Sequence, residues 1–191
     1  KKRFDSIKDK NEPGNPIYYY LDIISWLNMD NYEDQKYPVH YKVIFKWKDL
    51  NDLNNANKNP DSNIVEYIKQ NKPHVLAIAS SDLLENNGNT DKGVLATPMD
   101  MKKQKEYKIG NMVYKLDSVL IRDIEQNHFS GLLTLNGDEY MFDGENDKSP
   151  LMKKAWMKYF NKNKNFKITS SIPEKYNFGK GYSCSIYYRI K

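Results

Sequence analysis

Two residues near the middle of the chain have the types and spacing of a proton-handling pair. The stretch NHFSGLLTLNGDEYMFDG, residues 127–144, places His128 at the start of one apolar run and Asp143 at the end of the next. A histidine acts as a general base when an acceptor on one ring nitrogen fixes its tautomer, and a carboxylate is a suitable acceptor. Such a pair would serve a nucleophile, typically a cysteine thiol.

A β-hairpin would bring this histidine and aspartate together. Asn136-Gly137 is the strongest short-range signal for a tight hairpin turn, and it separates two strand-like runs. Because His128 begins the first run and Asp143 ends the second, we expect both side chains at the same end of the sheet. Any hairpin can carry a histidine and an aspartate in these places, so the motif alone does not identify an enzyme.

The elements around this hairpin predict an α+β protein. Apolar spacing and capping residues predict helices at residues 17–29, 63–71 and 149–163, and a polar loop at 49–63. Alternating or continuous apolar runs predict strands at residues 39–47, 73–80, 114–123, 128–136, 138–144 and 181–190. The expected architecture is an N-terminal helix packed on a largely antiparallel meander, with one late helix before the last strand.

Length and composition indicate one domain. A chain of 191 residues with 39% hydrophobic and 29% charged residues fits a single compact core. Residues 1–13 are charged and contain Pro and Gly breakers, so we expect a flexible N-terminal segment followed by one domain over residues 14–191.

The charge distribution does not favour a nucleic-acid partner. The net charge of +5 is mild, and the lysines are spread along the sequence, with local clusters such as Lys153–Lys164. No apolar run approaches the length needed to cross a bilayer, so no membrane partner is expected.

The single cysteine, Cys184, permits a reducing compartment. Cytoplasm or a virus particle would be such a place. One cysteine allows neither an intrachain disulfide nor a Cys-based zinc site, and His40 and His74 stand apart from any acidic or Cys cluster with ligand spacing. We therefore expect no metal and no cofactor.

The order of the motifs resembles that of the ubiquitin-specific proteases. In this family a His-aromatic pair opens a strand, a hairpin follows, and an aromatic pair precedes the aspartate; His128-Phe129 is similar to the first pair, and Tyr140 and Phe142 stand before Asp143. The segments KPHVLAI, TPMDM, YKLDSVLIRD and GYSCSIYYRI are similar to family segments in the same order. The resemblance implies a papain-like fold without the finger module, in which His128 matches the base and Asp143 the residue that orients it.

The resemblance fails where the nucleophile should be. The family places its Cys at the start of the first helix, after an Asn and a Gly-Asn pair that Gly14-Asn15 matches. The Cys position holds Ile17 in one register or Tyr19 in another. Glu12 stands where the oxyanion-stabilising Asn is expected, with Asn11 one step further away. The binding residues that the resemblance implies are Asn11, Gly14, Asn15, Asn127 and Phe129.

Three hypotheses follow from this damaged motif. The first is a catalytically inactive deubiquitinase-like module that binds ubiquitin or another protein. The second is an active cysteine-type deubiquitinase whose nucleophile comes from outside this chain or from Cys184. The position of Cys184 within an aromatic strand argues against Cys184, because a buried thiol is inert. The third is a structural subunit of a larger assembly, for example a viral one. The first hypothesis makes the chain a pseudoenzyme rather than an enzyme.

Overall fold

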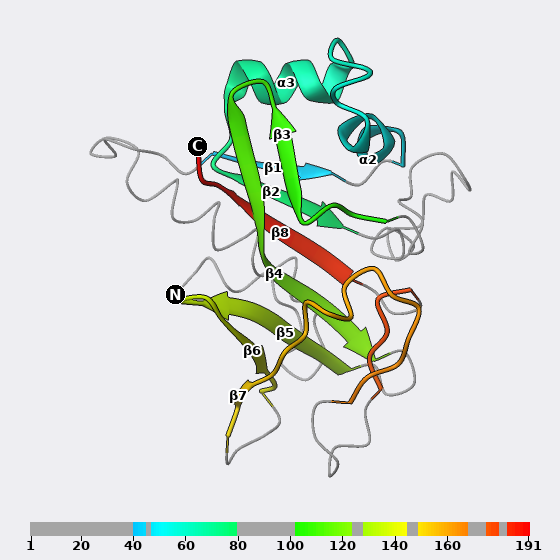
Figure 1. The fold of residues 1–191 in the computed structure, drawn as a ribbon, viewed down its shortest axis with the longest axis vertical. Coiled ribbons are helices and arrows are strands. Elements are labelled where there is room, and N and C mark those ends of the chain that lie inside the picture. Colours follow the sequence, from blue (N-terminus) through cyan, green and yellow to red (C-terminus); the bar gives the residue numbers. More distant parts are fainter. Residues whose placement is uncertain are drawn as a thin grey trace, which may run out of the picture.

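The computed structural model describes residues 40–44, 47–79, 102–123, 128–144, 149–167, 175–179 and 183–191. These residues form one eight-stranded sheet with two helices (Figure 1). The elements are β1 (Tyr41–Ile44), α2 (Trp47–Asn54), α3 (Asn63–Asn71), β2 (Val75–Ala79), β3 (Glu106–Ile109), β4 (Met112–Asp123), β5 (His128–Leu135), β6 (Asp138–Phe142), β7 (Leu151–Lys153) and β8 (Ser183–Arg189). The predicted α+β class is confirmed, whereas the predicted helix at 17–29 lies outside the described residues.

The sheet is mostly antiparallel, but it is not a simple meander. Its strand order is β1-β2-β8-β4-β5-β6-β7, with β3 paired to β4. Strands β1 and β2 run parallel, and the last strand, β8, lies between β2 and β4 in the middle of the sheet (Figure 1). The expected meander is thus restricted to β4 through β7. The pairing of β8 joins residues far apart in sequence, which local patterns do not reveal.

Two helices cover one end of the sheet. Helix α3 was predicted at its observed position, and its apolar stripe of Ile64, Val65 and Ile68 is buried. Helix α2 falls largely within residues 49–63, which were predicted to form a loop, so this prediction is wrong. Leu50 and Leu53 are buried in the core at helical spacing. Their burial outweighs the weak helix propensity of the Asn and Asp residues around them.

The β5–β6 hairpin is confirmed. Asn136 and Gly137 both have positive φ, at 53° and 84°, as a two-residue turn of type I′ requires. The register pairs Leu135 with Asp138 next to the turn and Gly131 with Phe142 at the far end. This register fixes which side chains of the two strands share a face.

The late helix predicted at residues 149–163 is absent, and this prediction is wrong. Residues 151–153 instead form β7, which pairs with β6 and extends the sheet. Tight turns then follow, with i to i+3 backbone bonds from Tyr159 to Trp156 and from Lys162 to Tyr159. Successive turns bury Trp156 and Phe160 at nearly the same spacing as a helix would, so the apolar pattern did not distinguish the two structures.

Each face of the sheet carries its own apolar cluster. The main core lies on one face and includes Leu76 and Ile78 of β2, Val119 and Ile121 of β4, and Leu132 of β5. The smaller cluster lies on the other face and takes alternate residues of β2 and β8, among them Ala77 and Cys184. A residue's position along its strand therefore decides to which face it belongs. Side chains can therefore contact each other across neighbouring strands only when they point to the same face.

Candidate functional site at the end of the hairpin

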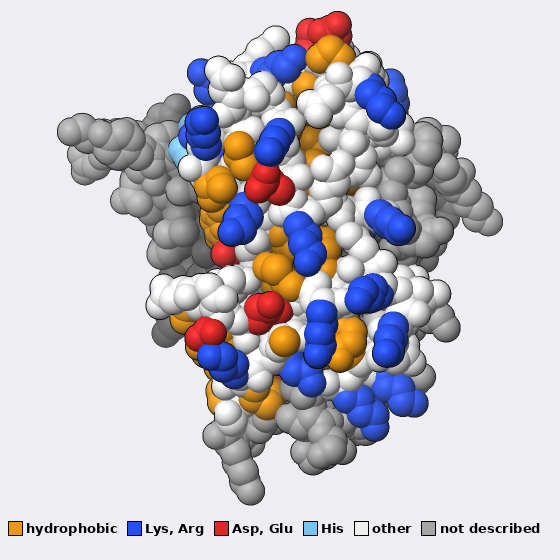
Figure 2. All heavy atoms as spheres, in the orientation of Figure 1, with side chains coloured by type: hydrophobic (Ala, Val, Ile, Leu, Met, Phe, Trp, Pro, Cys, Tyr) orange, Lys and Arg blue, Asp and Glu red, His pale blue; other side chains and the backbone are white. Residues whose placement is uncertain are grey.

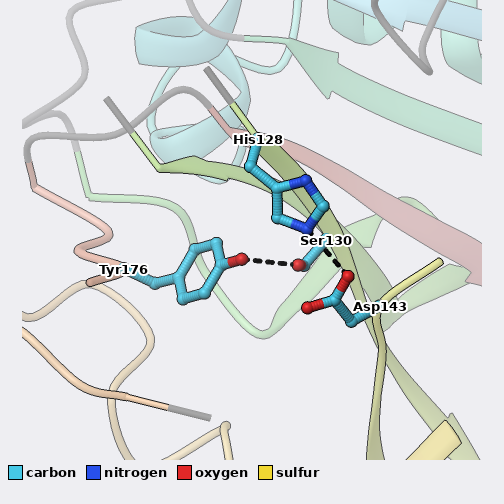
Figure 3. Close-up of polar contacts among 4 residues, drawn as sticks. All are labelled: His128, Ser130, Asp143 and Tyr176. Carbon is cyan, nitrogen blue, oxygen red and sulfur yellow. Dashed lines mark hydrogen bonds and ion pairs between the residues drawn. The ribbon is translucent and has the colours of Figure 1, made fainter. Parts of the chain in front are cut away.

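His128 and Asp143 meet at one end of the β5–β6 hairpin. The Nε2 atom of His128 lies 2.8 Å from Oδ1 of Asp143, a hydrogen-bond distance (Figure 3). Asp143 follows the last residue of β6, and the register that pairs Gly131 with Phe142 brings it to the strand position next to His128 on the same face. The expectation that the two side chains share one end of the sheet is confirmed. Their catalytic roles remain a prediction.

Both side chains of the pair are largely shielded from water. The side chain of His128 is 12% exposed and that of Asp143 is 4% exposed. The backbone N–H of Asp143 donates to the carbonyl of Pro150 at 2.8 Å, which fixes the residue just beyond β6. Because the carboxylate engages Nε2, any base chemistry on a nucleophile would fall to Nδ1. The geometry is that of a histidine oriented by a carboxylate.

A second polar pair lies beside the first and was not predicted. The hydroxyls of Ser130 and Tyr176 are 2.7 Å apart, and both residues are buried (Figure 3). Ser130 is two residues after His128 on β5, so strand alternation places both on the same face. The two-residue spacing of His128 and Ser130 could be read from the sequence. Tyr176 could not be predicted in the same way, because it lies 46 residues after Ser130 in the chain. The hydroxyl pair ties this segment to the strand that carries the histidine.

The only cysteine of the chain lies on the other face of the sheet. Cys184 in β8 pairs with Leu120 of β4, and both belong to the smaller apolar cluster. The adjacent pair Ile121 and Ser130 lies on the main-core face, as His128 does by alternation. Cys184 is buried, and its burial raises the pKa of the thiol to about 12. The sheet thus separates Cys184 from the histidine, and the prediction that this thiol is a packed core residue is confirmed.

His40 and His74 form a contact that the sequence gave no reason to expect. Their ring centroids lie 5.9 Å apart, and Nδ1 of His74 accepts a hydrogen bond from the backbone N–H of His40 at 3.1 Å. Partial burial, then Arg189, then His40 lower the pKa of His74. Among the residues that the structure describes, no group of three or more His, Cys, Asp or Glu side chains could hold a metal ion.

The remaining predicted residues divide into two groups. Phe129 lies on β5, next to His128 but on the opposite face of the strand. The other five positions, Asn11, Gly14, Asn15, Asn127 and the predicted nucleophile position at Ile17 or Tyr19, lie outside the described residues. The structure therefore brings together the base and its carboxylate, and it places Cys184 away from them.

A shallow cavity of about 280 Å³ lies elsewhere, between the end of α2 and β3. Several of its polar groups already bond to one another. The Tyr107 hydroxyl donates to the Asn54 side chain at 3.1 Å, and the Gln104 amide donates to the Asn54 carbonyl at 2.9 Å. These contacts hold α2 against β3 and make the cavity part of the scaffold.

Comparison with known proteins identifies no family for this chain. No protein-family model matches the sequence, and no curated protein is significantly similar to it. Within the described residues, no helix has the length and apolar character that a membrane span requires. The site's own geometry must therefore carry any functional conclusion.

Proposed function

We propose that this chain is a catalytically inactive, deubiquitinase-like module that binds a protein partner at the His128 end of the sheet. Its fold would be a compact, fingerless form of the papain-like ubiquitin-specific-protease fold. The first candidate partner is the C-terminal tail of ubiquitin. The observation that carries the proposal is that His128 and Asp143 are assembled at hydrogen-bond distance while the chain's one thiol is buried on the opposite face.

The burial and position of Cys184 favour an inactive protein over one in which Cys184 hydrolyses ubiquitin conjugates. A thiol must be a thiolate to attack a carbonyl, and a pKa of about 12 leaves almost none at neutral pH. It must also reach its base within hydrogen-bond distance, which a sheet between the two groups prevents. The motif that would hold the nucleophile has Ile17 or Tyr19 at the Cys position, and neither side chain attacks an isopeptide.

A second candidate function is an active deubiquitinase completed by a nucleophile from another chain. The retained His128–Asp143 contact favours it, because a buried pair of this kind is what such a nucleophile would need. A structural role within a larger, for example viral, assembly is compatible with the first proposal. A chain with one cysteine and no intrachain disulfide is compatible with a reducing compartment, cytoplasm or virion.

The test is a titration of isotope-labelled ubiquitin followed by NMR. We expect shift changes at the ubiquitin tail, and the His128→Ala variant should weaken binding at least about fivefold, or ~1 kcal/mol. Leu135→Ala is the matched control, since Leu135 ends the same strand and is 50% exposed at the hairpin turn. Absence of tail shifts, or an equal loss in both variants, would contradict binding at this site.

A further inference from the structure

A lysine-rich stretch of the sequence, residues 149–179, follows the hairpin, and the structure describes its residues 149–167 and 175–179. Residues 149–179 contain seven lysines and one acidic residue, Glu174, so their formal charge is +6. Since the whole chain carries +5, all other residues together sum to −1. The sequence suggested scattered cations, yet essentially the entire net charge belongs to this one segment. Figure 2 shows blue side chains gathered over the part of the molecule where Figure 1 places it.

Four lysines of this segment are exposed to solvent, and one of them, Lys158, also lies over the Tyr159 ring at 5.1 Å. Lys158, Lys162, Lys164 and Lys167 are all exposed, and none of the four forms an ion pair with a carboxylate among the described residues. Lys153 differs, because its ammonium lies 2.8 Å from Asp138. Four exposed charges that are not neutralised locally can attract an anionic partner.

An aromatic cluster holds the backbone of the segment in place. Trp156, Phe160, Phe166, Tyr176 and Phe178 are buried together. Phe166 and Tyr176 exchange two backbone hydrogen bonds at 2.9 and 3.0 Å, and the Asn177 amide donates to the Asn165 side chain.

The fit within the segment is close. A Cβ added at Gly179 would lie 3.0 Å from the Cβ of Asn163. Lys158, Lys162, Lys164 and Lys167 therefore project from the packed, described part of the segment, and such packing lowers the entropy lost when a ligand binds.

The chemistry of the surface indicates the class of partner. Interfaces with proteins have an apolar centre, whereas interfaces with nucleic acids are polar and positively charged. Among the exposed large apolar side chains of the described residues, only Leu151 belongs to the segment, and it lies at the start. Exposed Asn163 and Asn165 alternate with lysines 162 and 164. Their amides can bond to phosphate and sugar oxygens, while lysine contacts phosphate as a point charge.

We propose that Lys158, Lys162, Lys164 and Lys167 form a surface that binds the phosphate backbone of nucleic acid without sequence preference. The inference is independent of the proposed protein-binding function, since it uses none of the hairpin-end residues. Four phosphate contacts predict a slope of log affinity against log salt of about −3.6 for duplex DNA and about −2.8 for a single strand.

Fluorescence anisotropy tests this surface with a labelled DNA of about 20 nucleotides, as a single strand and as a duplex. The variant K158Q/K162Q/K164Q/K167Q should bind at least about tenfold more weakly near 0.1 M salt. The control K48Q/K58Q/K105Q/K115Q removes the same charge from exposed positions elsewhere and should keep most of the affinity. A preference for one DNA form identifies the backbone geometry that the surface fits.

Three outcomes would overturn the proposal. One is no binding of either DNA form at low salt. Another is an equal loss in the two variants, which would mean that net charge alone drives association. The third is tighter binding to poly-glutamate or to phosphatidylserine vesicles than to DNA, which would assign the surface to an acidic protein or a membrane. Unchanged urea midpoints of both variants show that the folded proteins are being compared.

Discussion

The two faces of the sheet carry different reactive groups, and these groups differ in their burial and their partners. On one face, His128 meets Asp143 at the end of the hairpin and keeps part of its surface exposed. On the other, Cys184 is buried in the smaller apolar cluster, paired with Ala79 of β2 and Leu120 of β4. The two groups that a thiol protease must join are therefore both present but separated by the sheet. The difference indicates that the cysteine packs in the core and that the histidine pair holds the end of the hairpin.

The reactivity of Cys184 should give the largest effect. With the pKa raised from 9.0 to about 12, the thiolate fraction near neutral pH falls by about a thousandfold. Because the sulfur is also enclosed by the core, Ellman's reagent should modify the native protein on the order of a hundredfold more slowly than the urea-unfolded protein. A native rate equal to the unfolded rate would show that the thiol is accessible and would remove the contrast between the faces.

Loss of the carboxylate at the hairpin end should be the next largest effect. Asp143→Ala removes the 2.8 Å contact to the mostly buried His128, and we expect about 1–3 kcal/mol of lost stability in urea unfolding. Asp143→Asn keeps a carbonyl oxygen near Nε2 and should lose less. If both variants unfold like the parent protein, the pair does not hold the hairpin end in shape.

The hydroxyl pair should contribute less. Tyr176→Phe leaves the buried Ser130 hydroxyl without this partner and should cost about 1 kcal/mol. The double variant S130A/Y176F removes both polar groups, so its loss should be smaller than the sum of the two single losses. A double-mutant cycle in urea measures the coupling, and strict additivity would contradict a direct bond between the lysine-rich segment and β5.

The smallest effect should come from His74, the contrasting histidine at the other end of the sheet. Its pKa is lowered in the folded protein, so protonation favours the unfolded state and breaks the bond from the His40 N–H. The stabilising contribution is present above pH 6.5, the ordinary value, and is lost as the pH falls through the lower folded pKa. A His74→Gln variant should show a weaker decline in stability below pH 6.5, and an unchanged decline would place its cause elsewhere.

Local patterns predicted the part of the site that one hairpin builds. The Asn136-Gly137 turn fixed the register, and the register brought His128 to Asp143. The contact of Ser130 with Tyr176 and the central place of β8 depend on pairings between distant residues, which no local pattern contains. The helix predicted at 149–163 failed for a related reason. The open edge of β6 paired with residues 151–153, and tertiary pairing outweighed the helical spacing.

We propose that this chain binds a protein partner, with the C-terminal tail of ubiquitin as the first candidate, without forming a covalent bond to it. The most direct measurement is mass spectrometry after incubation with ubiquitin that carries a thiol-reactive group at its C-terminus. We predict the unmodified mass under denaturing conditions and a noncovalent complex under native conditions. A covalent adduct in the denaturing spectrum, lost in a Cys184→Ser variant, would show that the buried thiol reaches the ubiquitin tail and would contradict the account.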